Sequence, residues 1–267
     1  MTVPRPKVNG STALPFIQLS DGSVSSKTAP PTPTNKASPS ERARLCFAVK
    51  GHVVVTGGAG DIGSVACRAL LEHGLEGLAI FDIYPLEGDK LVNVTDEAAV
   101  NEAVAQAEAL FGTIDIGLCF AGITQAIHAL DISAKDWRKM FEVNTAGAFL
   151  VAIILIASIS AFTANFPQPQ VYYNASKAAL ISAKGSLAAE WARYGIRVNS
   201  ISPGYMDTIL NEGNSLEEYR RTWVTRLPYG RMGQPEELTG AVILLCSSAG
   251  NYITGADILV DGGITIF

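Results

Sequence analysis

The chain has 267 residues, of which 48% are hydrophobic, and carries a formal net charge of −5 at pH 7. This is enough for one large hydrophobic core or two small ones. No apolar run reaches the ~18–20 residues of a membrane helix, and the acidic body argues against nucleic acid as a partner.

The four cysteines lie far apart in the sequence, and all but Cys46 sit in apolar segments. This pattern is typical of reduced core thiols in an intracellular protein, so we expect a cytoplasmic location. The three histidines do not have the spacing of metal ligands, and we expect no metal site.

The N-terminal residues differ from the rest of the chain. Residues 1–50 contain seven lysines and arginines against two acidic residues, and they include the proline-rich stretch "TAPPTPTNKASPS". We predict a disordered tail over 1–45 and one folded domain over 46–267. A basic, acid-poor N-terminus is also typical of a mitochondrial transit peptide, although the prolines weaken the amphipathic helix that such a signal needs.

Strand-like and helix-like segments alternate after residue 51. The expected strands are 52–57, 77–82, 114–122, 152–158, 196–204 and 257–263, and the expected helices are 62–74, 95–112, 133–150, 172–195 and 235–250. Continuously apolar strands between helices indicate a parallel sheet that is buried on both faces. The sequence therefore predicts a single-domain α/β fold with a doubly wound parallel sheet and helices on both faces.

A glycine-rich turn, "TGGAGDIG", joins the first strand to the first helix. Gly57, Gly58, Gly60 and Gly63 would let the backbone approach a pyrophosphate, which would then lie at the helix N-terminus beside Asp61 and Ile62. Without a ligand the same residues would simply form a tight turn. In this strand–turn–helix context we predict a dinucleotide-binding, Rossmann-like site.

Asp82 ends the second strand, 19 residues after Gly63. A carboxylate at this place accepts hydrogen bonds from the adenosine ribose hydroxyls and repels a 2′-phosphate. No lysine or arginine is present in 57–63 or 83–86 to hold such a phosphate. The sequence therefore favours NAD over NADP.

The segment "VYYNASK" places Lys177 four residues after Tyr173, so the two share one face of a helix, whereas Tyr172 points elsewhere. An ammonium close to a phenol lowers the pKa of the phenol, which makes it a usable acid or base. The alternative is an ordinary amphipathic helix, because this spacing is common by chance.

Together, "TGGAGDIG", "VNTAG", "YNASK", "EWARYGIRVNSISPG" and "YITGADILVDGG" resemble the short-chain dehydrogenase/reductase family over about residues 50–263. The segment "SISAFTANFPQPQVYYNASK" is most similar to the branch that acts on polyols and ketoses, such as arabinitol, mannitol and sorbose. The resemblance implies a secondary alcohol and its ketone as substrates, with hydride transfer between substrate and cofactor.

The resemblance also assigns catalytic roles. Tyr173 would be the acid/base, Lys177 would lower its pKa and bind the nicotinamide ribose, and Ser160, 13 residues before Tyr173, would hydrogen-bond the substrate oxygen. Asn144 would hold a proton-relay water near Lys177. Ser160 as a turn or capping residue and Asn144 as an ordinary helix residue remain alternatives.

Further cofactor contacts follow from the same resemblance. Pro203 and Gly204 would begin the loop beside the nicotinamide, and Thr208 would hydrogen-bond its carboxamide, unless it is a plain loop hydroxyl. Ala121 and Gly122 in "FAG" would lie beside the cofactor, and Asn93 would take the place of an aspartate that contacts adenine.

Three substitutions depart from the family pattern. Asp61 replaces the middle glycine of the turn and would place a negative charge near the pyrophosphate. Phe120 replaces an asparagine, and Asn93 replaces the aspartate. The glycine spacing is also similar to that of sugar-nucleotide epimerases, but this chain has no room for their additional substrate domain.

Two connections are short for a parallel sheet. Only 83–89 separate the second strand from the strand-like "KLVNVT" at 90–95, and seven extended residues reach about 23–25 Å, barely the return along a strand of roughly 17–20 Å. The 16 steps from Asn144 to Ser160 must also hold a strand. We therefore expect an internally shortened family member with at least one crossover helix missing or truncated.

The sequence thus predicts an NAD-dependent oxidoreductase of a polyol or related alcohol. The alternative is a catalytically impaired, truncated family member that acts only by binding or association. The resemblance implies a homo-oligomer, and the shortened helix after Asn144 favours a dimer through the C-terminal region over a tetramer.

Overall fold

The computed structural model describes residues 16–29, 37–84, 91–150, 153–211 and 216–266. Its centre is a six-stranded sheet in the order β2-β1-β3-β4-β5-β6. All five strand pairings are parallel. The strands are β1 (His52–Thr56), β2 (Gly77–Phe81), β3 (Ile116–Cys119), β4 (Ile154–Ile156), β5 (Asn199–Pro203) and β6 (Asp257–Val260). The predicted α/β fold with a doubly wound parallel sheet is confirmed.

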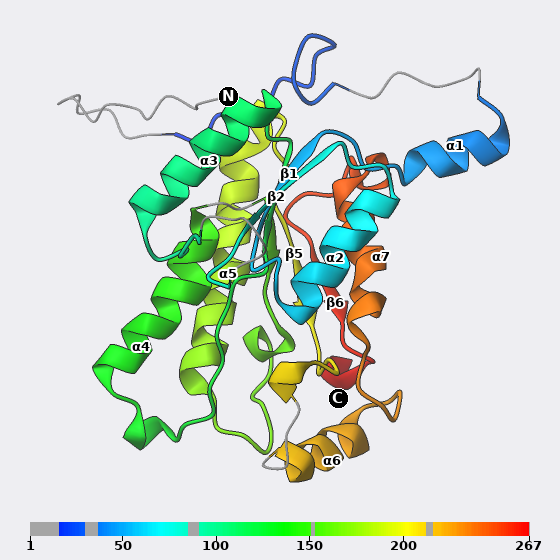
Figure 1. The fold of residues 1–267 in the computed structure, drawn as a ribbon. Coiled ribbons are helices and arrows are strands. Elements are labelled where there is room, and N and C mark those ends of the chain that lie inside the picture. The colour runs from blue at the N-terminus through cyan, green and yellow to red at the C-terminus, as the bar shows by residue number, and fades with distance from the viewer. Residues whose placement is uncertain (1–15, 30–36, 85–90, 151–152, 212–215, 267) are drawn as a thin grey trace.

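Two helices cover one face of the sheet, α2 (Asp61–Glu72) and α7 (Thr239–Cys246). They pack side by side on the right of Figure 1. Alternate residues of β1, Val53 and Val55, point toward this side and pack with Leu70 of α2 and Val242 of α7. Burial of this aliphatic cluster stabilises the fold through the hydrophobic effect.

Three helices cover the opposite face, α3 (Glu97–Phe111), α4 (Ala134–Phe141) and α5 (Val171–Trp191). Val54, which alternates with its neighbours on β1, packs against Val100 and Ala103 of α3. Leu155 of β4 packs against Leu180 of α5. The period-two alternation of these strands therefore places apolar residues on both faces, as a doubly wound sheet requires.

The strand-like segment at 90–95 does not join the sheet. Residues 91–95 form turns and irregular backbone, and the amide of Val92 makes one hydrogen bond to the Asp82 carbonyl at 2.8 Å. Val92 and Val94 are nevertheless buried. The expectation of a strand here is wrong, and the physical reason is the connection after β2, whose seven residues barely reach back along a strand.

Neither a strand nor a further crossover helix is present between β2 and α3 among the described residues. A helix separates each pair of consecutive strands among the described residues, and α3 provides the crossover from β2 to β3. This leaves β2 at the edge of the sheet. The expected internal shortening therefore lies between β2 and α3, where the described residues contain neither the strand nor a helix leading to it.

The second short connection is absorbed differently. α4 continues without interruption into a π-helical segment, Glu142–Gly147. The next strand, β4, has only three residues. The helix predicted at 133–150 is thus present, and the strand predicted at 152–158 is shortened.

Two helices were not foreseen. α6 (Glu217–Arg226) precedes α7, and α1 (Pro39–Cys46) lies in the stretch that was expected to be disordered. Ser38 caps α1 by accepting a hydrogen bond from the Glu41 amide at 3.2 Å, and proline stands at its start. No helix in the described part of the chain is long and apolar enough to cross a membrane.

Candidate active site

The glycine turn follows β1 directly and requires glycine at two positions. Gly57 has a positive φ of 70°, and a side chain there would meet the Ala121 amide nitrogen at 2.4 Å. A side chain at Gly63 would meet the Gly57 carbonyl oxygen at 2.2 Å. The turn therefore packs tightly against the residues that follow β3, including Ala121.

The first turn of α2 is open toward a ligand. Its N-cap residue, Gly60, makes no side-chain capping hydrogen bond. Amides at an uncapped helix N-terminus attract an anion such as a diphosphate. There is also space at Gly60, since a Cβ atom added there would lie 3.5 Å from its nearest neighbour, the Gly57 carbonyl oxygen.

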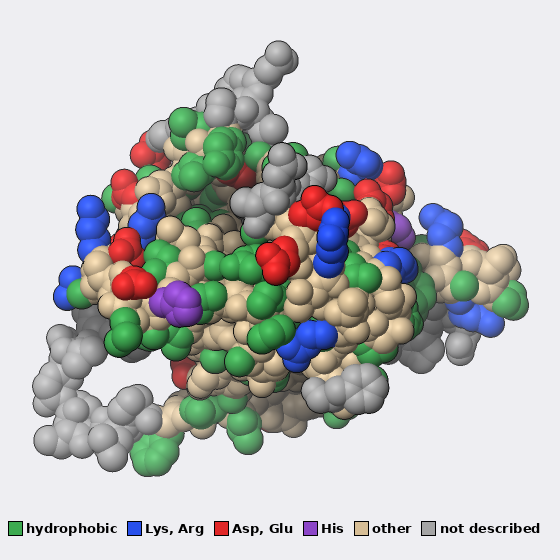
Figure 2. Space-filling model, turned by 90° about the horizontal axis from the view of Figure 1, so that it is seen from below, with side chains coloured by type: hydrophobic (Ala, Val, Ile, Leu, Met, Phe, Trp, Pro, Cys, Tyr) green, Lys and Arg blue, Asp and Glu red, His purple; other side chains and the backbone are tan. Residues whose placement is uncertain are grey.

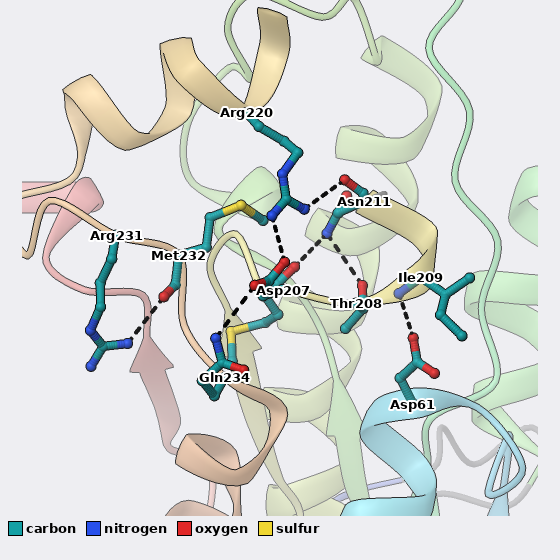
Figure 3. A network of polar contacts seen from close by, with 10 residues as sticks. Asp61, Asp207, Thr208, Ile209, Asn211, Arg220, Arg231, Met232 and Gln234 are labelled. Carbon is teal, nitrogen blue, oxygen red and sulfur yellow. Dashed lines mark hydrogen bonds and ion pairs between the residues drawn. The ribbon is translucent and has the colours of Figure 1, made fainter. Parts of the chain in front are cut away.

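Asp61 opposes this arrangement. Its carboxylate accepts a hydrogen bond from the backbone amide of Ile209 at 2.7 Å, which ties α2 to the loop after β5 (Figure 3). The carboxylate therefore occupies the space beside the first turn of α2, where its negative charge would meet that of a diphosphate.

Asp82 lies at the carboxyl end of β2, as predicted, and faces the glycine turn. One carboxylate oxygen accepts from the Ala59 amide at 3.0 Å, and the other from the amides of Ile83 and Tyr84 at 2.7 and 3.1 Å. The first oxygen keeps an unused lone pair, which can accept from a ribose hydroxyl.

Asn93 lies in the turn before α3. It is exposed, and its side-chain oxygen accepts from the amide and the hydroxyl of Thr95 at 3.1 and 3.0 Å. That oxygen stabilises the turn before α3 and is not available for an adenine. The glycine turn, the open helix end and Asp82 nevertheless fit a dinucleotide.

A cavity of about 350 Å³ opens beside this turn, at the carboxyl ends of the strands. Parallel α/β sheets bind their ligands at this edge. The predicted site residues that line it are Ile62, Gly122, Ser160, Tyr173, Lys177, Pro203, Gly204 and Thr208. Residues from five different segments therefore meet in one cavity.

Tyr173 and Lys177 lie on the same side of α5, with the lysine Nζ 5.7 Å from the centre of the Tyr173 ring. Lys177 is buried, and its Nζ donates to the Ile156 carbonyl at 2.7 Å. Burial lowers the pKa of Lys177 to about 8. The adjacent Tyr172 points away, is fully buried and donates its hydroxyl to Gln125 at 3.1 Å.

The effect of Lys177 on the Tyr173 phenol differs from the expectation. Burial raises the pKa of Tyr173, and the Ser158 hydroxyl opposes that rise through a hydrogen bond. The net shift of the Tyr173 pKa is therefore upward, opposite to the predicted lowering, because burial disfavours the charged phenolate more than the neighbouring hydroxyl stabilises it. The phenol is neutral at neutral pH and can serve as a proton donor.

Two serines, and not one, line the cavity together with the phenol. Ser160 belongs to a short 3-10 helix, Ile159–Ala161, which Ser158 caps. The Ser158 hydroxyl accepts from the Ser160 amide and donates to the Ser160 hydroxyl oxygen, both at 3.1 Å. The proton of the Ser160 hydroxyl thus remains available for a substrate oxygen.

Asn144 lies in the π-helical segment and is almost fully buried. Its amide clasps the backbone of Ile123, accepting from the nitrogen at 2.8 Å and donating to the carbonyl at 2.9 Å. The same Nδ2 lies 3.1 Å from the Ser176 hydroxyl. Asn144 therefore holds the cavity wall at Ile123 against α5, which is more than an ordinary helix residue does.

The loop after β5 carries Pro203, Gly204 and Thr208. Arg220 of α6 ties it down by an ion pair to Asp207 at 2.7 Å and a hydrogen bond to the Asn211 carbonyl at 2.9 Å (Figure 3). Thr208 is buried, and its hydroxyl lies 3.4 Å from the Asn211 amide group. The loop is held from one side by α6 and from the other by Asp61.

The segment after β3 runs beside Lys177. Its amide at Phe120 donates to the Thr56 carbonyl at 2.9 Å. A side chain at Gly122 would lie 3.3 Å from the Asn144 oxygen and 3.6 Å from the Lys177 nitrogen. Glycine at 122 therefore leaves room next to Lys177, and Phe120 lines the cavity where the family has asparagine.

Several cavity residues were missed by the sequence reasoning. They include Ser158 and a group of polar and aromatic side chains on the wall away from the glycine turn, namely Gln125, Asn165, Gln168, Tyr205 and Trp223. The amides in "NFPQPQ", directly before the catalytic helix, were an available signal. Trp223 lies on α6, which was not predicted.

A larger groove of about 590 Å³ lies between α4, the π-helical segment and α5, but it is lined mainly by apolar side chains such as Trp137 and Phe149. It does not contain the phenol, the lysine or the serines. On the face seen in Figure 2, side chains of both charge signs are interspersed among the described residues, without a large area of one sign.

Comparisons with known proteins agree with this geometry. A family profile described as "Enoyl-(Acyl carrier protein) reductase" matches residues 90–265. The NADH-dependent L-xylulose reductase of Ambrosiozyma monospora is 34% identical over 264 residues, which cover 82% of this chain and 97% of the relative. The NADP-dependent mannitol dehydrogenase of Hypocrea jecorina is 36% identical over 253 residues, covering 82% and 94%.

The part of this chain that is matched is shorter than either aligned length, so both alignments leave gaps in this chain, in keeping with the two short connections. Among solved structures, a short-chain type dehydrogenase/reductase from Mycobacterium marinum superimposes with a TM-score of 0.76 at 33% identity, covering 82% of this chain and 98% of that one. The chain therefore belongs to the short-chain dehydrogenase/reductase family of oxidoreductases.

Proposed function

We propose that this protein is an NAD-dependent dehydrogenase that interconverts a secondary alcohol of a polyol and the corresponding ketose. The observation that carries the proposal is the meeting of Tyr173, Lys177 and Ser160 in one cavity beside the glycine turn. The L-xylulose reductase and mannitol dehydrogenase names of its relatives support the substrate class.

Each side chain has a role in the proposed reaction. In the direction of ketone reduction, the neutral Tyr173 phenol donates its proton to the carbonyl oxygen, and Ser160 donates a hydrogen bond to that oxygen as its negative charge develops. In alcohol oxidation the ionised phenolate of Tyr173 takes up the hydroxyl proton and becomes the neutral phenol, while Ser160 hydrogen-bonds the substrate oxygen. The bound nicotinamide would supply or accept the hydride.

Lys177, which lines the cavity, and the buried Asn144 support this chemistry. The Lys177 ammonium favours the ionised form of the phenol once the proton has left. Asn144 fixes Ile123, and thereby the wall opposite α5, through its two hydrogen bonds to that backbone. We propose that Gly57, Gly58, Gly60, Gly63 and Ile62 hold the diphosphate.

The preference for NAD is proposed from Asp82. Its carboxylate faces the glycine turn with one oxygen able to accept a further hydrogen bond, and a 2′-phosphate at this place would meet its negative charge. The relatives include proteins named for NADH and for NADP, so the cofactor preference of this chain is inferred from its own residues.

The test is a panel of polyols and ketoses with NAD(H) and NADP(H), followed by absorbance of the reduced nicotinamide. Turnover of a polyol–ketose pair with NAD at least tenfold more efficient than with NADP supports the proposal. Turnover of none of these pairs overturns it.

A second candidate is a catalytically impaired family member whose dinucleotide site is blocked and that acts only by binding or association with another molecule. The hydrogen bond from Ile209 to Asp61 favours it, because it holds the loop and a negative charge where the diphosphate would lie. Thermal unfolding with and without NAD separates the two: a dehydrogenase is stabilised by NAD in a concentration-dependent way.

A further inference from the structure

Four side chains on one wall of the catalytic cavity form a connected polar network: Asn165, Gln168, Tyr205 and Trp223. The Trp223 indole donates to the Gln168 oxygen at 2.9 Å, and the Gln168 amide nitrogen donates to the Tyr205 hydroxyl at 3.3 Å. The Asn165 amide nitrogen donates to the same hydroxyl at 3.2 Å. The catalytic roles proposed above use none of these groups.

The chemistry of the groups fixes the orientation of the network. An indole N–H can only donate, so the oxygen of Gln168 must face Trp223 and its NH₂ must face Tyr205. Tyr205 is also held in place by its ring, which stacks on Trp223 with centroids 4.4 Å apart and planes 9° from parallel. Gln168 and Trp223 are both buried, so the network has little freedom to rearrange.

The Tyr205 hydroxyl is consequently left with an unused proton. Its oxygen accepts two hydrogen bonds, from Asn165 and Gln168, and these use both lone pairs. The proton of the hydroxyl therefore has to find an acceptor elsewhere, and Tyr205 lines the cavity.

Asn165 supplies the complementary group. Its side-chain oxygen is buried and has no hydrogen-bond partner among the described residues. A buried polar atom without a partner costs about 1–3 kcal/mol, so the pair is poised to gain from a ligand that brings both a donor and an acceptor. A hydroxyl group is such a ligand, because it donates and accepts at once.

The other residues that line the cavity restrict the chemical class of the ligand further. Lys177 is the one charged side chain among the described residues that line this cavity. A carboxylate or phosphate at the end of the substrate would therefore find no cation near the Tyr205 wall. A purely aliphatic chain would leave the Tyr205 proton and the Asn165 oxygen unpaired.

We propose that Tyr205 and Asn165 form a hydroxyl-recognition subsite that selects an uncharged polyhydroxylated substrate over a plain alcohol or ketone and over a sugar acid. This rests on the proposed function for the site of the reaction. It adds the residues that read the rest of the substrate, and Gln168 and Trp223 act as positioning residues for Tyr205.

The test compares L-sorbose with the hydroxyl-free ketone of the same carbon skeleton and carbonyl position. The ratio of kcat/KM for sorbose to that for the plain ketone is measured in the wild type, Tyr205→Phe and Asn165→Leu. Tyr205→Phe keeps the ring and its stacking on Trp223 but loses the proton. We expect the ratio to fall by about 10- to 100-fold in both variants, since a site built for a hydroxyl loses discrimination when its partner group is removed.

Tyr252→Phe is the matched control, because Tyr252 is fully exposed. Its ratio should equal that of the wild type. Dinucleotide affinity and the melting temperature are measured for every variant, and a variant that fails to fold is recognised by these readouts. If Asn165→Leu does not fold, Tyr205→Phe alone decides the outcome.

Sorbose binding is measured separately by saturation-transfer NMR on the wild type and Tyr205→Phe. Turnover with an unchanged ratio in Tyr205→Phe overturns the subsite and leaves the proposed function standing. Sorbose binding that depends on Tyr205 without any turnover supports the subsite and overturns the proposed function. A wild type that neither binds nor turns over sorbose or the other polyols and ketoses overturns both.

Discussion

The carboxylate of Asp61 accepts a hydrogen bond from the backbone amide of Ile209 at 2.7 Å. This contact joins the first turn of α2 to the loop after β5, two segments that border the proposed diphosphate site from opposite sides. A cofactor that enters must approach this carboxylate or displace it from the loop. Asp61 thus opposes cofactor binding in two ways: its negative charge repels the diphosphate, and its hydrogen bond holds the loop after β5 against the first turn of α2.

Asp61→Gly should therefore bind NADH more tightly than the wild type. Two charges several ångströms apart near a protein surface interact with an energy on the order of 1–2 kcal/mol, which corresponds to about a tenfold change in Kd. Titration of the nucleotide fluorescence measures it. Asp61→Asn removes the charge but can keep the hydrogen bond to Ile209, so equal tightening in both variants identifies the charge as the cause.

Glu72→Gln, at the exposed far end of α2, is the control for removing a carboxylate from this helix and should leave the affinity unchanged. Weaker binding in Asp61→Gly would show instead that the Asp61–Ile209 contact helps to shape the site.

Tyr173→Phe should lose at least 1,000-fold in kcat, roughly the share that general acid–base catalysis contributes, with nearly unchanged NADH affinity. Only the proton donor is removed, and the ring still packs beside Lys177. Tyr172→Phe, which loses a hydrogen bond to Gln125 outside the catalytic pair, should be mild. Steady-state kinetics decides, and an inactive Tyr172→Phe with an active Tyr173→Phe would reverse the assignment of the two tyrosines.

Asp82→Ser combined with Ile83→Arg should shift the cofactor preference toward NADP. The change removes the carboxylate at the end of β2 and adds a cation at the exposed neighbouring position. The measurement is the ratio of kcat/KM with NAD to that with NADP. A wild type that already prefers NADP would contradict the role given to Asp82.

The sequence was sufficient for the sheet and for the residues around the glycine turn. The strands are continuously apolar and the helices have clear ends, so local pattern and tertiary packing agree. The segment 91–95 shows the limit of such reasoning: Val92 and Val94 alternate as in a strand, yet the connection is too short for them to pair along the sheet. The limited reach of the short connection therefore decided the structure of this segment, although its residues have high β-propensity.

The polar wall of the cavity could not be derived from local pattern. Tyr205 follows β5, Trp223 lies on α6, and Gln168 precedes α5, so their network exists only in the folded chain. The rise in the pKa of Tyr173 was likewise not foreseen, because burial is a property of the whole site. Spacing shows which groups share a helix face, but it does not show how dry their surroundings are.

Lys177 should make stability depend on pH in the protein without cofactor. Its pKa is lowered by burial to about 8 from an ordinary value of 10.5. Below pH 8 the native state must hold a buried cation. Between pH 8 and 10 the unfolded chain binds this proton and the native protein does not, so the free energy of unfolding rises with pH.

The measurement is urea unfolding of the wild type and Lys177→Met across this range. The stability of the wild type relative to the variant should rise by about 2 kcal/mol from pH 8 to 10. Tyr173 titrates above its ordinary value of 10 and contributes little in this window. Lys135→Met, which removes an exposed lysine from α4, should show no such rise. A flat difference for Lys177→Met would show that the ammonium is not desolvated.

The last prediction concerns the short connections. β2 is an edge strand in which four of five residues are only partly buried, and Ile83, Tyr84 and Leu91 beside it are 56%, 69% and 53% exposed. Burying several hundred Å² of such surface would contribute on the order of 10 kcal/mol to the free energy of unfolding, at ~25 cal/mol per Å². The net free energy of unfolding of a natural domain is only ~5–15 kcal/mol. The chain should therefore melt at a low temperature and associate through this edge.

Inserting an amphipathic helical segment after Tyr84, and another after Leu150, should raise the melting temperature and the NAD affinity, as measured by calorimetry and light scattering. A chain that is monodisperse, cooperatively folded and fully active without these insertions would refute the prediction.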